Sequence, residues 1–485
     1  MRVLLVSPPL RNMDLSQVRV RGVMPPLDLL HLAAWLQKHG HETRVLDLYA
    51  REVEEEDFPK VAEMWKPDLV GFTTYTANVD VSLRLARASK QALPEVPVVL
   101  GGIHASYLPE VCLAEPAVDW VVRGEGEETL RELVEALAAG RSPRGLAGLA
   151  WREEPGVVDS GPPRPLLKDL DALPWPDYGQ LDFDRYYLAV TREVTGRRVA
   201  NVLTMRGCPY RCTFCSHHYG YEGGLRKRSP EDVVRQLRHL KERHGVGEVQ
   251  IEDNSFTCDP KRVLRICELL EAEGLDLVWN CNVRAETASR ELFDAMHRAG
   301  CRRVLLGVES GSAEMLERMK KGITLEQVRR AVTLARRHGL LVNCAFILGT
   351  PGETRESAEA TYRFALELDP DFVMFSVLVP VIGSELFDAA VSAGKVRPEA
   401  VQGADFVTVY SEKAPLPEMS EVPREELLAL MERYTRGFYL RPAYFLRRLR
   451  ALRSPSELRR LFWGFALVVR HQILRLLPGP AEDDA

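Results

Sequence analysis

Two blocks of the chain alternate short apolar runs with amphipathic segments, and this alternation constrains the fold most. In the first block, strands are predicted at 2–7, 43–48, 67–75, 96–102 and 119–127, and helices at 25–40, 79–92 and 127–139. Short apolar strands separated by helices are typical of a parallel sheet covered on both faces. In such sheets, ligands bind at the carboxyl ends of the strands.

The second block predicts six strand–helix units in a row. Its strands are predicted at 199–205, 248–254, 277–284, 303–310, 341–349 and 371–380. Six consecutive units indicate an open relative of the eight-unit barrel, with its active site at the carboxyl ends of the strands.

A segment with six prolines between Pro155 and Pro176 separates the blocks. Prolines at this density interrupt regular structure and mark a connection. We therefore predict an α/β chain in four parts: a doubly wound Rossmann-like domain (1–142), a linker with a hairpin (143–198), a partial barrel (199–395) and a helical region (396–485).

The composition is that of a globular protein. Hydrophobic residues make up 46% and charged residues 27% of the 485 residues, and the net charge of −5 gives no reason to expect nucleic-acid binding. The nine cysteines are an odd number, and the start of the chain does not read as a signal peptide. We therefore expect a reducing cytoplasm. No apolar run reaches 18 residues, so we expect no transmembrane helix.

The stretch "RGCPYRCTFCSHH" places Cys208, Cys212 and Cys215 within eight residues. A structural zinc site needs four ligands, so zinc would have to recruit His217 or His218. Zinc ribbons and fingers pair two such knuckles, and a second is missing from the sequence. The triplet also follows a predicted barrel strand directly. Both points favour an iron–sulfur cluster with one open iron.

"CPYRCTFC" resembles the signature of radical S-adenosylmethionine (SAM) enzymes. The resemblance implies a [4Fe-4S] cluster whose open iron binds the amino and carboxylate groups of SAM, and reductive cleavage of SAM to a 5′-deoxyadenosyl radical. Phe214 matches the family's aromatic position near adenine. Further matches at successive strand ends imply SAM contacts by Glu252, Asp253, Arg284, Glu309, Ser310, Ile347 and Gly349. Taken singly, each acid is more typical of a helix cap or a surface ion pair, but their shared placement at successive strand ends after the cluster motif favours SAM contacts. Arg284 is also typical of a solvated strand end, and Phe214 of a core residue. A loop-packing role is favoured for His217 and His218.

The first block resembles the cobalamin-binding domain of one radical SAM subclass, which includes class B methyltransferases and anaerobic Mg-protoporphyrin ester cyclases. The resemblance implies cobalamin contacts by Thr73, Thr74, Gly101, Gly102, His104, Gly124 and Glu125. The D-x-H-x-x-G loop that gives cobalt a histidine elsewhere is absent. We therefore expect cobalamin without a histidine ligand to cobalt, and the alternative is a relic domain that binds no corrinoid.

A basic region lies near the end of the sequence. Between Arg433 and Leu477 lie eleven arginines and one acid, Glu457. The favoured interpretation is a helix packed on the barrel with its arginines in solvent, and the alternative is peripheral contact with an anionic membrane at its inner face.

The resemblance implies an enzyme that methylates an unactivated carbon of a hydrophobic or natural-product-like small molecule, with flavodoxin or ferredoxin as reductant. One alternative is a radical cyclase, ring-contracting or C–C-bond-forming enzyme acting on a tetrapyrrole or lipid. A non-enzymatic corrinoid or metal carrier is another. The sequence names neither a catalytic residue nor a substrate.

Overall fold

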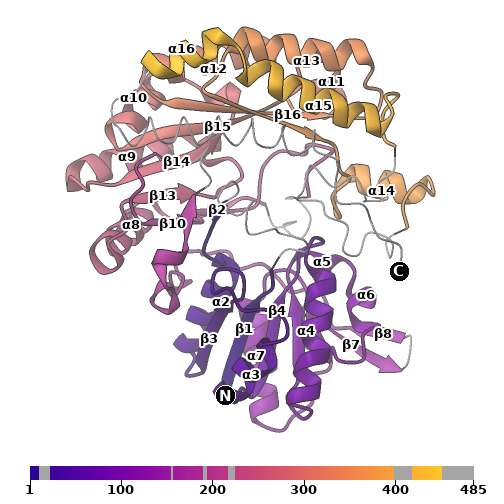
Figure 1. Cartoon of the computed structure of the whole chain (residues 1–485). Helices are drawn as coiled ribbons and strands as arrows, with labels where there is room; N and C mark the ends of the chain where they lie inside the picture. The colour runs from indigo at the N-terminus through magenta and orange to yellow at the C-terminus, as the bar shows by residue number, and fades with distance from the viewer. Residues whose placement is uncertain (10–21, 155–156, 189–193, 217–223, 398–417, 451–485) are drawn as a thin grey trace.

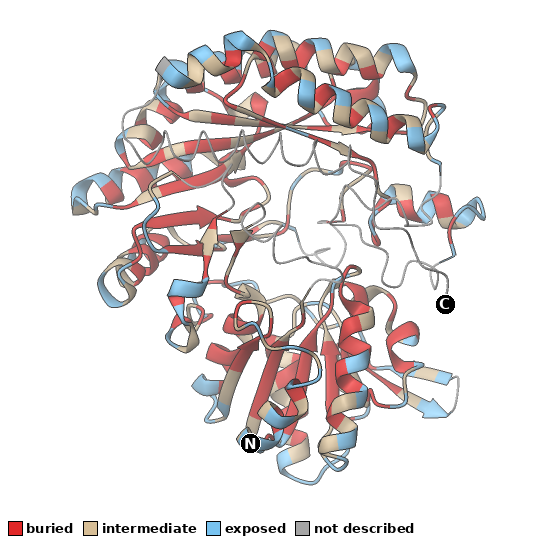
Figure 2. Ribbon diagram, in the orientation of Figure 1, coloured by how far each residue is buried: buried red, intermediate tan, exposed pale blue. Residues whose placement is uncertain are grey.

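The computed structural model describes residues 1–9, 22–154, 157–188, 194–216, 224–397 and 418–450. Two sheets dominate it, and the carboxyl ends of the first sheet's parallel strands point toward the second sheet (Figure 1). The strands of both sheets are mostly buried, whereas the outer faces of the surrounding helices are exposed (Figure 2). The α/β class predicted from the sequence is confirmed.

The first sheet has the order β3-β1-β4-β5-β6-β7-β8. Its strands are β1 (Arg2–Ser7), β3 (Glu42–Asp47), β4 (Leu69–Thr73), β5 (Val98–Gly101), β6 (Trp120–Val122), β7 (Leu149–Glu154) and β8 (Val157–Ser160). The first five pair in parallel, and β7 and β8 form an antiparallel hairpin at the edge. The predicted hairpin therefore extends this sheet. The strand order reverses between β1 and β4, and such a switch point is where doubly wound sheets bind ligands.

Helices cover both faces of the first sheet. They are α2 (Leu27–Lys38), α3 (Phe58–Trp65), α4 (Val79–Ala92), α5 (Ile103–Tyr107), α6 (Pro109–Leu113) and α7 (Glu127–Ala138). The sequence analysis missed α3, because only Phe58 and Ala62 of its eight residues are buried and an acidic run precedes it. The domain boundaries proposed above stay predictions.

The second sheet has the order β10-β13-β14-β15-β16-β17, with every neighbouring pair parallel. Its strands are β10 (Val199–Val202), β13 (Glu248–Ile251), β14 (Val278–Val283), β15 (Cys301–Glu309), β16 (Leu341–Leu348) and β17 (Phe372–Val377). This is the predicted six-unit open barrel.

The barrel's outer helices are α8 (Pro230–His244), α9 (Pro260–Glu273), α10 (Arg290–Arg298), α11 (Ala313–Arg318), α12 (Leu325–Arg337) and α13 (Arg355–Leu368). Helix α14 (Glu385–Ser392) follows the last strand and packs against α5 and α6 of the first sheet. Side-chain caps begin two of the outer helices: Ser229 accepts from the backbone of Asp232, and Thr324 forms a capping box with Gln327. Two short ladders complete the fold, β2 (Gly22–Val23) with β9 (Tyr187–Leu188) and β11 (Met205–Arg206) with β12 (Arg226–Lys227).

Helices α15 (Arg424–Tyr439) and α16 (Pro442–Arg450) cover the edge strand β17. The Tyr439 hydroxyl accepts from the Val373 amide at 3.0 Å and donates to the Val373 carbonyl at 2.8 Å. Arg441, Arg447 and Arg448 pair with acids at the start of β17. The described part of the basic region thus packs on the barrel, and residues 456–477, on which the membrane alternative rests, lie outside the described residues. Among the helices that are described, none is both long and apolar enough to cross a bilayer.

Candidate functional site

The cysteine loop follows β11 at the carboxyl end of the barrel. The amide of Thr213 donates to the carbonyl of Met319 at 3.0 Å, and the carbonyl of Thr213 accepts from the amide of Leu386 at 3.1 Å. These bonds fix the loop between the segments that follow the fourth and sixth barrel strands. The three thiols are therefore held on a supported backbone and not on an independent knuckle.

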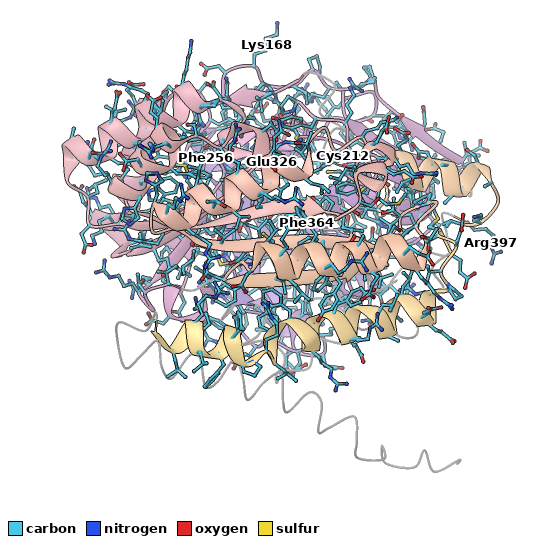
Figure 3. All side chains as sticks on the ribbon, turned by 90° about the horizontal axis from the view of Figure 1, so that it is seen from above. Lys168, Cys212, Phe256, Glu326, Phe364 and Arg397 are labelled. Carbon is cyan, nitrogen blue, oxygen red and sulfur yellow. The ribbon has the colours of Figure 1, made fainter. Side chains whose placement is uncertain are left out.

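The thiols are chemically suited to a cluster. None of the three forms a disulfide; Cys212 is buried, while Cys208 and Cys215 are half-buried. Burial raises the pKa of the Cys208 thiol, and the neighbouring cations Arg284 and Lys321 act in the opposite direction. Within the described ranges, no three His, Cys, Asp or Glu side chains converge on a single ion position. A [4Fe-4S] cluster does not need such convergence, because each thiolate binds its own iron. Figure 3 labels Cys212 on the barrel, whereas Lys168 of the linker projects outward.

Two cations from other segments of the barrel lie against aromatic rings of the cysteine loop. The Arg284 guanidinium lies 3.5 Å from the centre of the Tyr210 ring. Its Nη2 donates to the Lys321 carbonyl at 2.5 Å. The Lys321 ammonium lies 5.8 Å from the centre of the Phe214 ring and donates to Glu309 at 2.5 Å. The predicted residues Phe214, Arg284 and Glu309 are therefore brought together, and both cations are paired with carboxylates, Lys321 with Glu309 and Arg284 with Glu286.

Glu309 ends β15 in the left-handed backbone region, at φ 67°. Such a conformation in a residue other than glycine costs energy and is concentrated at functional sites. It directs the buried Glu309 carboxylate to Lys321, so the pair is neutralised within the site.

Asp253 requires a revised role. It is fully buried, and its carboxylate accepts from the Thr204 hydroxyl, the Thr204 amide at 2.6 Å and the Met205 amide at 3.0 Å. Burial raises its pKa to about 6 against the effect of these bonds. Because both oxygens are engaged, Asp253 holds the strand that leads into the cysteine loop. Of the predicted pair, half-buried Glu252 is the one left as a candidate SAM contact.

The remaining predicted SAM residues lie at the ends of β15 and β16. The Ser310 hydroxyl is buried against Thr361 at 3.1 Å, so it supports the backbone. Ile347 is half-buried, and Gly349 follows at φ 89° with its amide bonded to the buried carboxyl of Glu353. Ile347 and Gly349 therefore stay predicted SAM contacts, with the Gly349 amide already bonded to Glu353.

At the switch point of the first sheet, a cavity of about 290 Å³ lies between the two sheets. Its lining comprises Ser7, Met24, Pro25, Pro26, Leu27, Asp28, Thr73, Tyr75 and Asn201. Thr73 donates to Asp28 at 2.6 Å, whereas Thr74 is buried behind it and bonded to the Gly101 carbonyl at 2.7 Å. Thr73 therefore faces the cavity, and Thr74 supports the sheet.

Gly102 and His104 lie beside this edge. Gly102 has φ 95°, and a Cβ there would lie 2.5 Å from the Thr74 carbonyl oxygen, so only glycine fits. His104 is fully buried, its Nδ1 lies 3.2 Å from the Thr76 hydroxyl and its Nε2 has no hydrogen-bond partner in the described part of the chain. Burial lowers its pKa to about 4, so the ring is neutral.

The cavity fits the polar end of a corrinoid. The buried Oδ1 of Asn201 on its wall lacks a hydrogen-bond partner among the residues described. Buried polar atoms without partners are rare, and they are the groups that ligand amides satisfy. Residues 10–21, which include most of the loop after β1, lie outside the described residues, so cobalt without a histidine ligand stays a prediction.

The loop after β6 carries the predicted residues Gly124 and Glu125. The amide of Gly124 donates to Ser106, but the Glu125 carboxylate accepts from Arg226 at 2.6 and 2.8 Å. Arg226 belongs to the barrel, so Glu125 links the two sheets through an ion pair, and the predicted corrinoid contact of Glu125 stays a prediction.

Sequence reasoning missed Lys321, Tyr210, Glu127 and the arginines Arg206 and Arg226. Tyr210 and Arg206 lie inside the quoted cysteine motif, and Glu127 lies in "RGEGE", so attention to charge within these motifs would have found them. Lys321 and Arg226 carry no local signal, because only folding brings them to the site.

Comparisons with known proteins agree with this geometry. The radical SAM superfamily matches residues 202–365, and the B12 binding domain matches residues 17–134. An uncharacterized methyltransferase of Pyrococcus horikoshii is 34% identical over 92% of this chain and 94% of its own length. The anaerobic magnesium-protoporphyrin IX monomethyl ester cyclase of Rubrivivax gelatinosus is 30% identical over 92% of this chain and 78% of its own length.

The fold is shared with the radical SAM methyltransferase TsrM of Kitasatospora setae, solved with cobalamin and a [4Fe-4S] cluster bound. The TM-score is 0.71 at 22% identity, over 91% of this chain and 89% of that one. The zinc and carrier alternatives are set aside by the family relationship together with the supported cysteine loop. The chain belongs to the radical SAM superfamily of enzymes, within the group that carries a B12 binding domain ahead of the radical SAM domain.

Proposed function

We propose that this enzyme transfers a methyl group from SAM to an unactivated carbon of a hydrophobic small molecule, with cobalamin as the methyl carrier. One observation carries the proposal: the carboxyl edges of the two sheets face each other across a shared cavity. Asn201 of the barrel strand β10 lines it together with Thr73 of the first sheet. A corrinoid held at the switch point would thus lie on the same side as the cysteine loop.

When bound, the cluster supplies the electron that splits SAM into methionine and a 5′-deoxyadenosyl radical, and the corrinoid supplies the methyl group that replaces the abstracted hydrogen. The chain's own residues have positioning roles. Cys208, Cys212 and Cys215 would hold the cluster. Arg284 and the Glu309–Lys321 pair would orient the charged end of SAM, whose binding they favour by presenting both signs of charge.

The inner wall of the barrel supports a hydrophobic substrate. Alternate residues of β16 and β17 are buried under helices, and the other face is half-exposed or exposed. That face carries Ala345, Ile347, Met374 and Ser376, with Ala345 paired to Met374 across the strands. Met374 is 51% exposed. A mainly apolar wall favours a substrate with little charge.

A radical cyclase is the second candidate. The magnesium-protoporphyrin IX monomethyl ester cyclase favours it, because the similarity to that enzyme covers 92% of this chain. A cyclase would use the same cluster and SAM site without consuming the methyl group of SAM.

Flavodoxin or ferredoxin is the proposed reductant, because reduction of the cluster requires a one-electron donor of low potential. Peripheral membrane contact through residues 456–477 is proposed as a route to a lipid-soluble substrate. Cosedimentation of the full chain with anionic vesicles tests the membrane contact.

The test of methyl transfer is the stoichiometry of the SAM products. The chain is purified without oxygen, with cobalamin supplied during expression, and incubated with SAM, a chemical reductant and candidate apolar acceptors. A methyltransferase forms S-adenosylhomocysteine together with 5′-deoxyadenosine. Formation of 5′-deoxyadenosine alone, with no gain of a CH2 unit in the product, would move the assignment to the cyclase.

Cys212→Ala should abolish 5′-deoxyadenosine formation. Cys258→Ala is the matched control, since Cys258 is a half-buried thiol at the same end of the barrel, 3.9 Å from the Met205 sulfur and outside the triplet. Equal losses in both variants would contradict the assignment of the cluster ligands.

A further inference from the structure

The loop that carries the cysteines is closed at its base by two opposed arginines. Arg206 of β11 and Arg226 of β12 are direct partners in the antiparallel ladder. Gly207, between Arg206 and Cys208, has φ 87°, and a Cβ there would lie 2.7 Å from the Gly224 carbonyl oxygen. The two ends of the loop are therefore held tightly together, two residues from the first cluster cysteine.

Both arginines are neutralised by carboxylates of the other domain. Glu125 accepts two bonds from Arg226, at 2.6 and 2.8 Å, and lies 3.4 Å from Arg206. Glu127 accepts from Arg206 at 2.5 Å. Two like charges opposed on one ladder repel each other, so the paired carboxylates are what make this arrangement stable.

The cluster of charges is shielded from solvent. The side chains of Arg206, Arg226, Glu125 and Glu127 are between 5 and 11% exposed. Burial alone would raise the pKa of Glu127, but the charge and hydrogen bond of Arg206 outweigh it and lower the pKa to about 2. Buried His31 beside them is neutral, with a pKa lowered to about 3 by burial and by Arg206. Removing one member would leave an uncompensated buried charge.

Glu125 and Glu127 are also linked to the edge of the first sheet at which cobalamin binding is proposed. Glu125 lies in the loop between β6 and α7, and Glu127 is the first residue of α7. The loop is tied at Gly124 to Ser106 of α5 at 2.9 Å. Helix α5 also carries the buried His104. The elements at the edge of the first sheet and the base of the cysteine loop thus form one hydrogen-bonded unit.

We infer that Glu125 and Glu127, which belong to the cobalamin-binding domain, are positioning residues for the loop that carries the cluster cysteines. They align the base of the cysteine loop with the first sheet, and so fix the cluster relative to the corrinoid. The inference rests on the proposed cluster function of Cys208, Cys212 and Cys215. It assigns to the "RGEGE" loop a role toward the cluster beyond the corrinoid contact predicted for Glu125.

The test compares Glu125→Gln and Glu127→Gln with Glu128→Gln. Glu128 is the matched control, because it lies on the same first turn of α7 and pairs at 2.8 Å with Arg131 of its own helix. Each anaerobically purified holoprotein is challenged with a ferrous-iron chelator, and the electron paramagnetic resonance spectrum of the reduced cluster is recorded before and after SAM is added.

Glu125→Gln and Glu127→Gln should each release iron about tenfold faster than wild type. A smaller fraction of their clusters should change spectrum when SAM is added. Glu128→Gln should match wild type in both measurements. A merely structural role would lower the yield of folded protein but leave the spectrum of the folded fraction unchanged.

Iron release and spectra equal to those of Glu128→Gln would overturn the inference alone. A wild-type chain without iron would overturn the proposed function and the inference with it. If the single variants do not fold, Glu125→Arg is combined with Arg226→Glu. Recovery of a folded chain that retains iron would support the inference, and failure to recover would overturn it.

Discussion

Replacement of the buried Glu353 by glutamine should remove a defined part of the pH dependence of stability. Its Oε2 accepts from the Gly349 amide, and its Oε1 has no hydrogen-bond partner within the described residues. The side chain is fully buried, and burial raises its pKa from 4.5 to about 7. The carboxyl therefore binds a proton more tightly in the folded chain than in the unfolded chain.

The sign and size follow from linkage. A raised pKa means that the stabilising contribution is complete below 4.5 and is lost as pH rises through about 7. With these two pKa values, the contribution falls by about 1.3 kcal/mol between roughly pH 6 and pH 8. Glutamine has the same shape and accepts the Gly349 bond but does not titrate, so Glu353→Gln should lack this loss.

Urea unfolding of both proteins at the two pH values, without cofactors, measures the difference. Asp253 also titrates in this range, so the relevant quantity is wild type minus variant, in which its contribution cancels. Indistinguishable pH dependence in wild type and Glu353→Gln would refute the assignment of a raised pKa to Glu353.

Three further substitutions test the supports of the site. Asp253→Ala should destabilise the chain by about 2–4 kcal/mol, because it leaves buried donors of the entry to the cysteine loop unpaired; thermal unfolding checks it. Lys321→Met should weaken SAM binding about tenfold or more, because it leaves the buried Glu309 carboxylate without its cation. Equilibrium dialysis with SAM measures the affinity, and an unchanged affinity would contradict the role of the Glu309–Lys321 pair. Tyr439→Phe should lower the free energy of unfolding by about 1–2 kcal/mol, because the hydrogen bonds to Val373 at the barrel edge are lost. An unchanged unfolding midpoint would show that these bonds do not stabilise the edge strand.

Much of the fold could be read from the sequence because both sheets consist of short apolar strands that alternate with helices. The strand predictions at 2–7 and 341–349 match β1 and β16 to within one residue. The cysteine loop was also predictable, since its chemistry lies in one contiguous motif.

The roles of single acids were less predictable. Asp253 and Glu125 lie in the expected loops, yet their carboxylates are engaged by Thr204 and Arg226, which the chain brings together only on folding. Sequence spacing identifies which strand end a residue occupies. It does not identify whether the side chain faces the ligand or its own scaffold.

The most direct test of the account is the metal content of the anaerobically purified chain, with cobalamin supplied during expression. The account predicts about four irons with matching sulfide, and stoichiometric cobalt. Iron without cobalt would contradict the role assigned to the first sheet and leave a radical enzyme with a vacant cavity. Zinc at the three cysteines in place of iron would contradict the central claim.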